Sequence, residues 1–144
     1  MYLVVQDDVN SGAYSFIRKR TTIGNDGEKQ GSIYQLTDVA KKDGEVFETK
    51  RIISAREYNA SYRSRDLSRH IVRQERISFL YNTQSFTIHI YEQPSPGLCI
   101  LHAQVENKDN EIPVVELPDF LDVERPLEQS DKKAYGAYSL SIIR

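Results

Sequence analysis

Apolar and polar residues alternate with a period of two along much of the chain, which is the pattern of half-buried β-strands. The alternation is clearest in residues 14–22, 32–37 and 45–53. Turn-forming residues at 24–27 and at Asp43-Gly44 separate these segments. The pattern therefore predicts three neighbouring antiparallel strands joined by short turns.

A helix start follows the third predicted strand. Ser54 and Glu57 have the spacing of a capping box, in which the serine side chain accepts from the third helical N–H and the glutamate reaches back to the cap. We expect this helix to extend to about Tyr62.

The second half of the chain also favours strands. Residues 69–81 and 84–92 are typical of a hairpin around Asn82-Thr83, and a further strand is predicted at 98–106, after the Pro-rich loop 93–97.

The C-terminal part has a weaker pattern. Residues 117–121 indicate a short helical turn or packed loop, and residues 137–143 indicate a closing strand. Together the segments predict one α+β domain over residues 1–144, mostly antiparallel, with seven or eight strands and one or two helices.

Composition places the chain in the ordinary globular class. Of 144 residues, 39% are hydrophobic and 28% are charged, and no apolar run approaches the ~20 residues that span a bilayer. The first residues carry no secretory signal and are already strand-like, as expected for a domain cut from a longer protein. The single cysteine, Cys99, excludes a disulfide framework and a cysteine-based zinc site. These features favour a reducing, cytoplasmic location.

The net charge of −2 bears on the choice of partner, because proteins that hold nucleic acid on an outer surface are usually basic. A polyanion would therefore need locally concentrated positive charge. Arg18 and Arg20 share one face of their predicted strand, and Gln74 and Arg76 share a face of theirs. Arginines at this spacing direct fork-shaped donors to one side, which suits phosphate oxygens. The alternative is that they are solvated outer-face residues paired with acids.

His89 and His102 are expected near each other, because pairing around the 93–97 loop brings their strands together. Two such histidines could bind zinc or form a pH-sensitive anion contact. The alternative is a pair of half-buried imidazoles bonded to neighbouring side chains, since no third ligand is evident nearby.

Several sequence blocks in order resemble the CYTH (triphosphate tunnel) superfamily. The blocks are Arg18-Lys19-Arg20, residues 48–58, residues 74–82, residues 86–91 and Gly97-Leu98. The similarity is greatest to the CYTH-like C-terminal domain of the TRPL translocation defect proteins, through Ile53-Ser54-x-Arg56-Glu57-Tyr58, Phe79-Leu80-Tyr81-Asn82, residues 117–121 and residues 138–141.

This resemblance implies a β-barrel-like tunnel with charged inner walls. In the enzymatic members, arginines and lysines hold a triphosphate and acidic residues hold a divalent metal. In the translocation defect proteins an N-terminal nucleotide-binding domain precedes this one, and phosphoinositide binding is attributed to the protein. The resemblance thus implies such a domain in cis, a role in membrane trafficking and peripheral contact with endomembranes.

The chain departs from the enzymatic pattern at its acids. The Glu-x-Glu-x-Lys strand is missing, since residues 2–6 carry no acid in register. His89, His102 and Gln104 stand where acids are expected, and Glu106 remains in the same parity. Magnesium and manganese prefer carboxylates, so the loss of these acids predicts the loss of the metal and of hydrolysis.

The sequence therefore predicts a non-catalytic domain that binds a phosphoinositide headgroup or another polyphosphate, without cofactor, metal or nucleic acid. Parity alone does not choose between Lys50 and Arg51 as a further basic contact. The predicted ligand-binding set is Arg18, Arg20, Lys50, Gln74, Arg76, His89, His102 and Glu106.

Two alternatives remain at this point. One is a metal-dependent triphosphatase with an unusual acid set drawn from Glu45, Glu48, Glu75 and Glu106. The other is a protein-interaction scaffold whose tunnel is closed by Tyr and Phe side chains.

Overall fold

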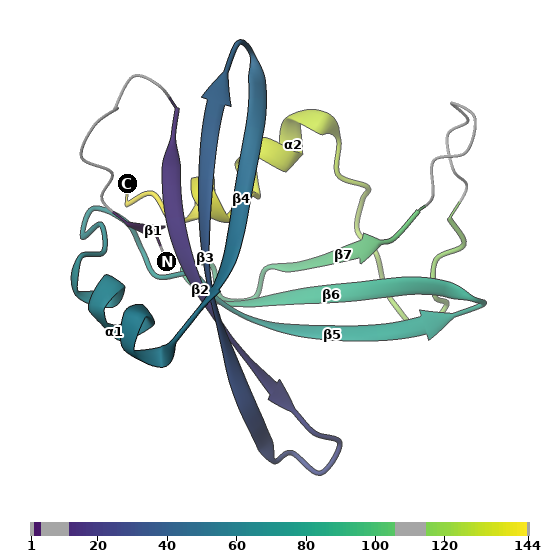
Figure 1. Cartoon of the computed structure of the whole chain (residues 1–144). Coiled ribbons are helices and arrows are strands. Elements are labelled where there is room, and N and C mark those ends of the chain that lie inside the picture. Colours follow the sequence, from purple (N-terminus) through teal and green to yellow (C-terminus); the bar gives the residue numbers. More distant parts are fainter. Residues whose placement is uncertain (1, 4–11, 106–114, 144) are drawn as a thin grey trace. The chain divides into compact units, whose positions relative to one another are not determined.

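A computed structural model describes residues 2–3, 12–105 and 115–143. The chain forms two compact units, one extending to Arg69 and including Ile143, the other running from His70 to Ile142 (Figure 1). Each unit is described by itself. The described residues form seven strands and three helices, and every strand pairing is antiparallel. The predicted α+β, mostly antiparallel class is confirmed, whereas one domain over residues 1–144 stays a prediction.

The first unit contains a four-stranded sheet with the order β1-β2-β3-β4. A two-residue turn joins β3 to β4, with φ of 54° at Asp43 and 80° at Gly44, as a type I′ hairpin requires. The predicted strands are confirmed, although β3 extends well beyond the predicted 32–37. The strands are β1 (Tyr2–Leu3), β2 (Tyr14–Ile23), β3 (Lys29–Lys42) and β4 (Glu45–Ile53).

Helix α1 (Ala55–Arg63) packs on one face of this sheet, which we call the helix face. The Tyr58 ring lies 5.0 Å from the Tyr34 ring, measured between centroids. Ile17, only 1% exposed, and the buried Ile53 share this face with Tyr34 according to the register. The apolar residues at alternate positions therefore form the core under the helix.

The capping box predicted at the start of α1 is confirmed. Ser54 Oγ accepts from the Glu57 N–H at 3.1 Å, and the Ser54 N–H donates to Glu57 Oε2 at 2.8 Å. Arg51 Nη1 also donates to Glu57 Oε1 at 3.3 Å. These bonds to the carboxylate, the backbone bond from Ser54 first, lower the pKa of Glu57.

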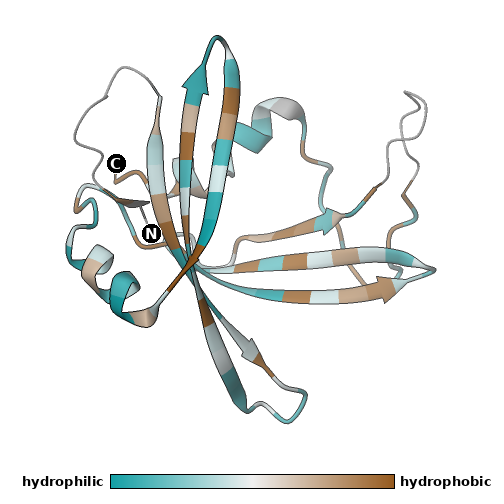
Figure 2. Cartoon of the chain, in the orientation of Figure 1, coloured by the Kyte–Doolittle hydropathy of each residue, from teal (hydrophilic) through white to brown (hydrophobic). Residues whose placement is uncertain are grey.

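The second unit contains a three-stranded sheet with the order β5-β6-β7, and its strands show the alternation of apolar and polar residues (Figure 2). Asn82 and Thr83, with φ of 46° and 64°, form the predicted turn. Two of its strands are shorter than predicted. The first begins at residue 73 instead of 69, and the last ends at residue 103 instead of 106. The strands are β5 (Arg73–Tyr81), β6 (Gln84–Gln93) and β7 (Cys99–Ala103).

One face of this second sheet is apolar. Phe86, which is 0% exposed, stacks on Phe79 with ring centroids 5.5 Å apart. Phe120 packs against Phe79 and Tyr81, each at 5.8 Å between centroids. The predicted turn at 117–121 is confirmed by the bond from Leu121 N–H to Pro118 O at 3.2 Å, and it brings Phe120 onto this face.

The closing strand predicted at 137–143 is wrong, because helix α3 (Ala137–Leu140) lies there. Bonds from Leu140 N–H to Gly136 O and from Ser141 N–H to Ala137 O, both at 3.0 Å, close its turns. In so short a segment the alternation of apolar residues fits a helical turn as well as a strand. The turn satisfies its backbone locally, whereas a strand needs a neighbour.

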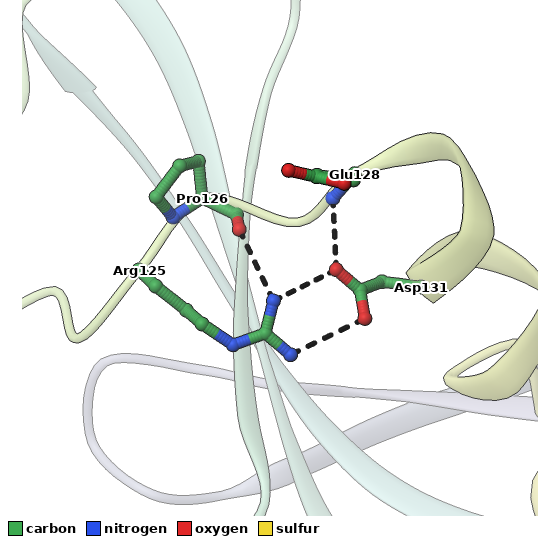
Figure 3. Close-up of polar contacts among 4 residues, drawn as sticks. All are labelled: Arg125, Pro126, Glu128 and Asp131. Carbon is green, nitrogen blue, oxygen red and sulfur yellow. Dashed lines mark hydrogen bonds and ion pairs between the residues drawn. The ribbon is translucent and has the colours of Figure 1, made fainter.

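An arginine–carboxylate pair precedes this segment, at α2 (Gln129–Ala134) (Figure 3). Arg125 binds Asp131 through two bonds of 2.7 and 3.2 Å, and the Glu128 N–H donates to the same carboxylate at 3.0 Å. These contacts, the side-chain bond from Arg125 first, lower the pKa of Asp131. The chain thus has three helices in its described part, more than the one or two predicted.

Neither sheet closes on itself among the described strands, so the strands form two open sheets. No helix of the described part is long and apolar enough to cross a membrane.

Replacing Ser54 with alanine should lower the free energy of unfolding by about 1 kcal/mol, because the Glu57 N–H loses its side-chain acceptor. Urea denaturation followed by circular dichroism measures this change. Arg56→Ala, an exposed change in the same helical turn, should have a much smaller effect. Equal losses from the two variants would contradict the role of the cap.

Candidate functional site

The face of the first sheet opposite α1 carries four cations and one acid among its described positions, and we call it the basic face. Its members follow from the register, in which Arg18 faces Gln35 and Gln35 faces Ile52, while Phe16 faces Thr37 and Thr37 faces Lys50. The side chains on this face, strand by strand, are Tyr14, Phe16, Arg18 and Arg20 on β2; Ile33, Gln35, Thr37, Val39 and Lys41 on β3; and Val46, Glu48, Lys50 and Ile52 on β4.

The strand register confirms that Arg18 and Arg20 share a face, and it decides between Lys50 and Arg51. Lys50 lies on the basic face, whereas Arg51 lies on the helix face and pairs with Glu57 at 3.3 Å. Arg18 and Arg20 are spaced by roughly 7 Å along β2, and Lys50 lies two strands away, roughly 10 Å across the sheet. Such a spread matches several phosphates better than one.

Positive charge exceeds negative charge on the basic face. Among its described positions the cations are Arg18, Arg20, Lys41 and Lys50, and the acid is Glu48. Glu48 lies 3.2 Å from Lys50, but both side chains are about half exposed, so solvent screens this pair. In a chain of net charge −2, this face is a local concentration of the opposite sign.

Thr37 lies between Phe16 and Lys50 on the same face and is only 1% exposed. Its Oγ1 is buried and has no hydrogen-bond partner among the described residues. A buried hydroxyl without a partner costs folding free energy.

The predicted residues of the second unit gather on one face of its sheet, which we call the histidine face. The register pairs Gln74 with Tyr91, Arg76 with His89, and Thr87 with both Ser78 and His102. This face is opposite the one that holds Phe79 and Phe86, so the polar side chains follow from the same alternation that builds the apolar core. Gln74, Arg76, His89 and His102 therefore lie on one face of this sheet, and the prediction that Gln74 and Arg76 share a face is confirmed.

Side-chain bonds order the histidine face. Arg76 Nε donates to Gln74 Oε1 at 2.9 Å, which fixes one edge of the guanidinium group. Gln74 also forms a hydrogen bond with the hydroxyl of Tyr91. Burial of Tyr91 raises the pKa of its phenol. Ser78 and Thr87 hydroxyls lie 3.0 Å apart. Arg76 is thus held in place by a neighbour that does not neutralise its charge.

His89 and His102 lie side by side, with ring centroids 4.1 Å apart and planes tilted by 31°. The predicted proximity is confirmed, although the two residues are diagonal neighbours, since His89 faces Ile100 and His102 faces Thr87. Partial burial, followed by the positive charge of Arg76, lowers the pKa of His102. No group of three potential metal ligands occurs among residues 2–3, 12–105 and 115–143.

The two predicted acids of the first unit do not share a face. Glu45 and Glu48 lie on opposite faces of the first sheet, and Glu75 lies on the Phe86 face of the second. Glu106 lies outside the described residues, so its predicted role stays a prediction.

Sequence reasoning missed two residues of the basic face, Lys41 and Thr37. Lys41 was missed because β3 was predicted to end at residue 37; with the turn at Asp43-Gly44, alternation carried through to Lys42 would have found it. Thr37 carries no sequence signal, because an unpartnered hydroxyl becomes evident only from the packing around it.

Comparison of the chain with protein-family models, with curated proteins and with solved structures found no match.

Thr37→Val should raise the free energy of unfolding by about 1 kcal/mol, because it removes a buried hydroxyl that has no partner. Thr21→Val is the matched control, since the Thr21 hydroxyl bonds Ser32 at 2.7 Å and its loss should be destabilising. Urea denaturation of both variants checks the opposite signs. Destabilisation by Thr37→Val equal to that of the control would contradict the assignment.

His102 should titrate below the ordinary histidine value of 6.5, as measured by NMR. Because the folded state takes up this proton less readily than the unfolded state, the His102 contribution to stability is lost as the pH falls from about 6.5 through the folded pKa. His102→Gln should flatten this part of the pH dependence, whereas His70→Gln serves as the control. A His102 pKa at or above 6.5 would contradict the burial argument.

Proposed function

We infer that this chain is a non-catalytic binding domain for a phosphorylated anion, either a phosphoinositide headgroup or a polyphosphate. The observation that carries the proposal is the basic face, where Arg18, Arg20 and Lys50 share one side of a sheet. Guanidinium groups form charge-assisted bonds to phosphate oxygens, and their planar fork suits two oxygens at once. A row of such groups favours a ligand with several phosphates.

The histidine face supports the same class of ligand. Arg76 is oriented by Gln74, and the paired imidazoles of His89 and His102 add donors beside it. These groups suit an oxyanion, because an arginine guanidinium and the N–H of an imidazole both donate to anionic oxygens.

The finer architecture is part of this proposal. It comprises the CYTH-like tunnel with basic walls, as in the domain of the translocation defect proteins, together with an N-terminal nucleotide-binding domain in cis. It also includes a cytoplasmic location with peripheral contact to endomembranes. The separation of Glu45 from Glu48 onto opposite faces supports binding over metal-dependent hydrolysis, since hydrolysis needs acids gathered around the metal.

The double variant Arg18→Ala/Arg20→Ala should weaken binding of tripolyphosphate or of phosphoinositide vesicles by about 100-fold. Two charge-assisted contacts of about 1.5 kcal/mol each account for this factor. Calorimetry measures the first ligand, and vesicle co-sedimentation at low and high salt measures the second. Wild-type binding should weaken as salt rises.

The matched control is Lys19→Ala/Arg51→Ala, which removes the same charge from the helix face. It should leave the affinity within a few-fold of wild type. Equal effects of the two double variants would show that net charge, rather than the basic face, determines binding. Phosphate release from tripolyphosphate that stops with a chelator would overturn the non-catalytic assignment.

A further inference from the structure

Strand β4 forms one edge of the first sheet (Figure 1). Its residues are exposed along nearly the whole strand. Val46 is 60% exposed, Phe47 51% and Ile52 67%. In the described part of the chain, β4 pairs with β3 and with no other strand. Open edges of this kind template the addition of another strand unless their side chains oppose it.

The backbone of β4 is prepared for such an addition. A two-residue hairpin closes on a hydrogen-bonded pair, here Lys42 and Glu45, and hydrogen-bonded and non-hydrogen-bonded pairs then alternate along the ladder. The N–H and C=O groups of every second residue therefore point away from β3. The residues concerned are Val46, Glu48, Lys50 and Ile52.

The side chains of β4 are complementary to the same strand running in the opposite direction. When Thr49 faces its own copy, Glu48 faces Lys50 and Val46 faces Ile52, and these are the pairs whose backbone groups point outward. Phe47 then faces Arg51 on the other side of the sheet, which allows a cation–π contact. Opposite charges and apolar pairs directly across two strands are stabilising.

Charge also selects this register over its neighbours. Two antiparallel strands must match outward-pointing residues, and the two adjacent registers that do so oppose Glu48 to Glu48 or Lys50 to Lys50. Like charges directly opposite each other are destabilising. The register centred on Thr49 is therefore the one in which both charge pairs are attractive.

We propose that two copies of this chain associate by antiparallel pairing of their β4 strands, with the two-fold axis at Thr49. The axis stands perpendicular to the joined sheet, so the basic faces of both copies lie on the same side of it. The outward backbone groups of four residues in each copy are satisfied by the partner copy. A single strand pair is a small interface, so the association is expected to depend on concentration.

A charged edge can also serve to prevent pairing, as lysines on edge strands do in many proteins. That purpose is served by charges of one sign or by charges that repel their own copy. The order of Glu48 and Lys50 about Thr49 instead attracts a second copy. A different occupant, such as a lipid surface contacted through Val46 and Phe47, is distinguished by the experiments below.

A disulfide at the proposed axis tests the register. In a Cys99→Ser background, which removes the exposed free cysteine, Thr49→Cys should give a covalent dimer on mild oxidation of the full chain. Facing residues of a non-hydrogen-bonded pair lie ~4.5 Å apart at Cα, within the range of a disulfide. Phe47→Cys is the matched control on the same strand and face, and its copies would be separated by four residues, roughly 13 Å. It should form at least ~10-fold less dimer.

Charge reversal tests the interaction in solution without any anion, so its outcome is separate from that of the proposed function. Sedimentation of the wild-type chain from 1 to 200 μM should give a dimer at the upper end of this range, roughly as expected for a small interface. Glu48→Lys should weaken association at least ~10-fold, and Glu48→Lys/Lys50→Glu should restore it. Val46→Pro, which removes an outward N–H and spares the β3 ladder, should also weaken it.

A chain that stays monomeric at the highest concentration would overturn the proposal, as would a dimer insensitive to both Glu48→Lys and Val46→Pro. Equal cross-linking of Thr49→Cys and Phe47→Cys would overturn the register. Vesicle binding that depends on Val46 and Phe47 in a strictly monomeric chain would assign the edge to a lipid surface instead.

Discussion

The antiparallel register of β2, β3 and β4 is the constraint on which the interpretation of the first unit depends. Successive side chains on a strand point to opposite faces, so a slip of one residue would exchange the helix face and the basic face. Arg18 and Arg20 would then lie under α1, and Ile17 would face away from it. Two features oppose such a slip. The two-residue turn at Asp43-Gly44 fixes the pairing of β3 with β4, and the burial of Ile17 and Ile53 under α1 fixes the pairing of β2 with β3.

Local sequence signals predicted the parts of the fold that depend on local physics. Each of these signals lies within a few residues of sequence: the alternation in β2 and β4, the turn residues, and the capping box at Ser54. The helix at Ala137–Leu140 was mispredicted because a short alternating segment satisfies two periods at once. The length of β3 was underestimated because its ends are polar. Lys41 and Lys42 are in the strand because they pair with β4, and not because lysine favours strands.

The candidate site was predictable to the extent that it follows from parity. Parity placed Arg18 with Arg20 and Gln74 with Arg76, and the loop between β6 and β7 placed His89 near His102. Parity did not choose between Lys50 and Arg51, because that choice depends on which face of the sheet α1 covers. The ion pair between Arg51 and Glu57 of α1 shows that Arg51 lies on the helix face. Strand pairing decides which charges from distant segments share a face, and a single sequence does not reveal that pairing.

The pairing proposed for the edge of the first sheet and the anion binding proposed for its face would use different groups. The proposed pairing along β4 would use outward backbone groups in the plane of the sheet, whereas the proposed anion binding would use side chains that project from it. Lys50 belongs to both, since in the paired register it faces Glu48 of the second copy and remains on the basic face. Adding a second copy would present two rows of arginines to one side, and a ligand array such as a phosphoinositide surface would bind both rows with greater avidity than either alone. A single soluble polyphosphate too short to reach both rows would gain nothing, so the edge matters for surfaces and long polymers.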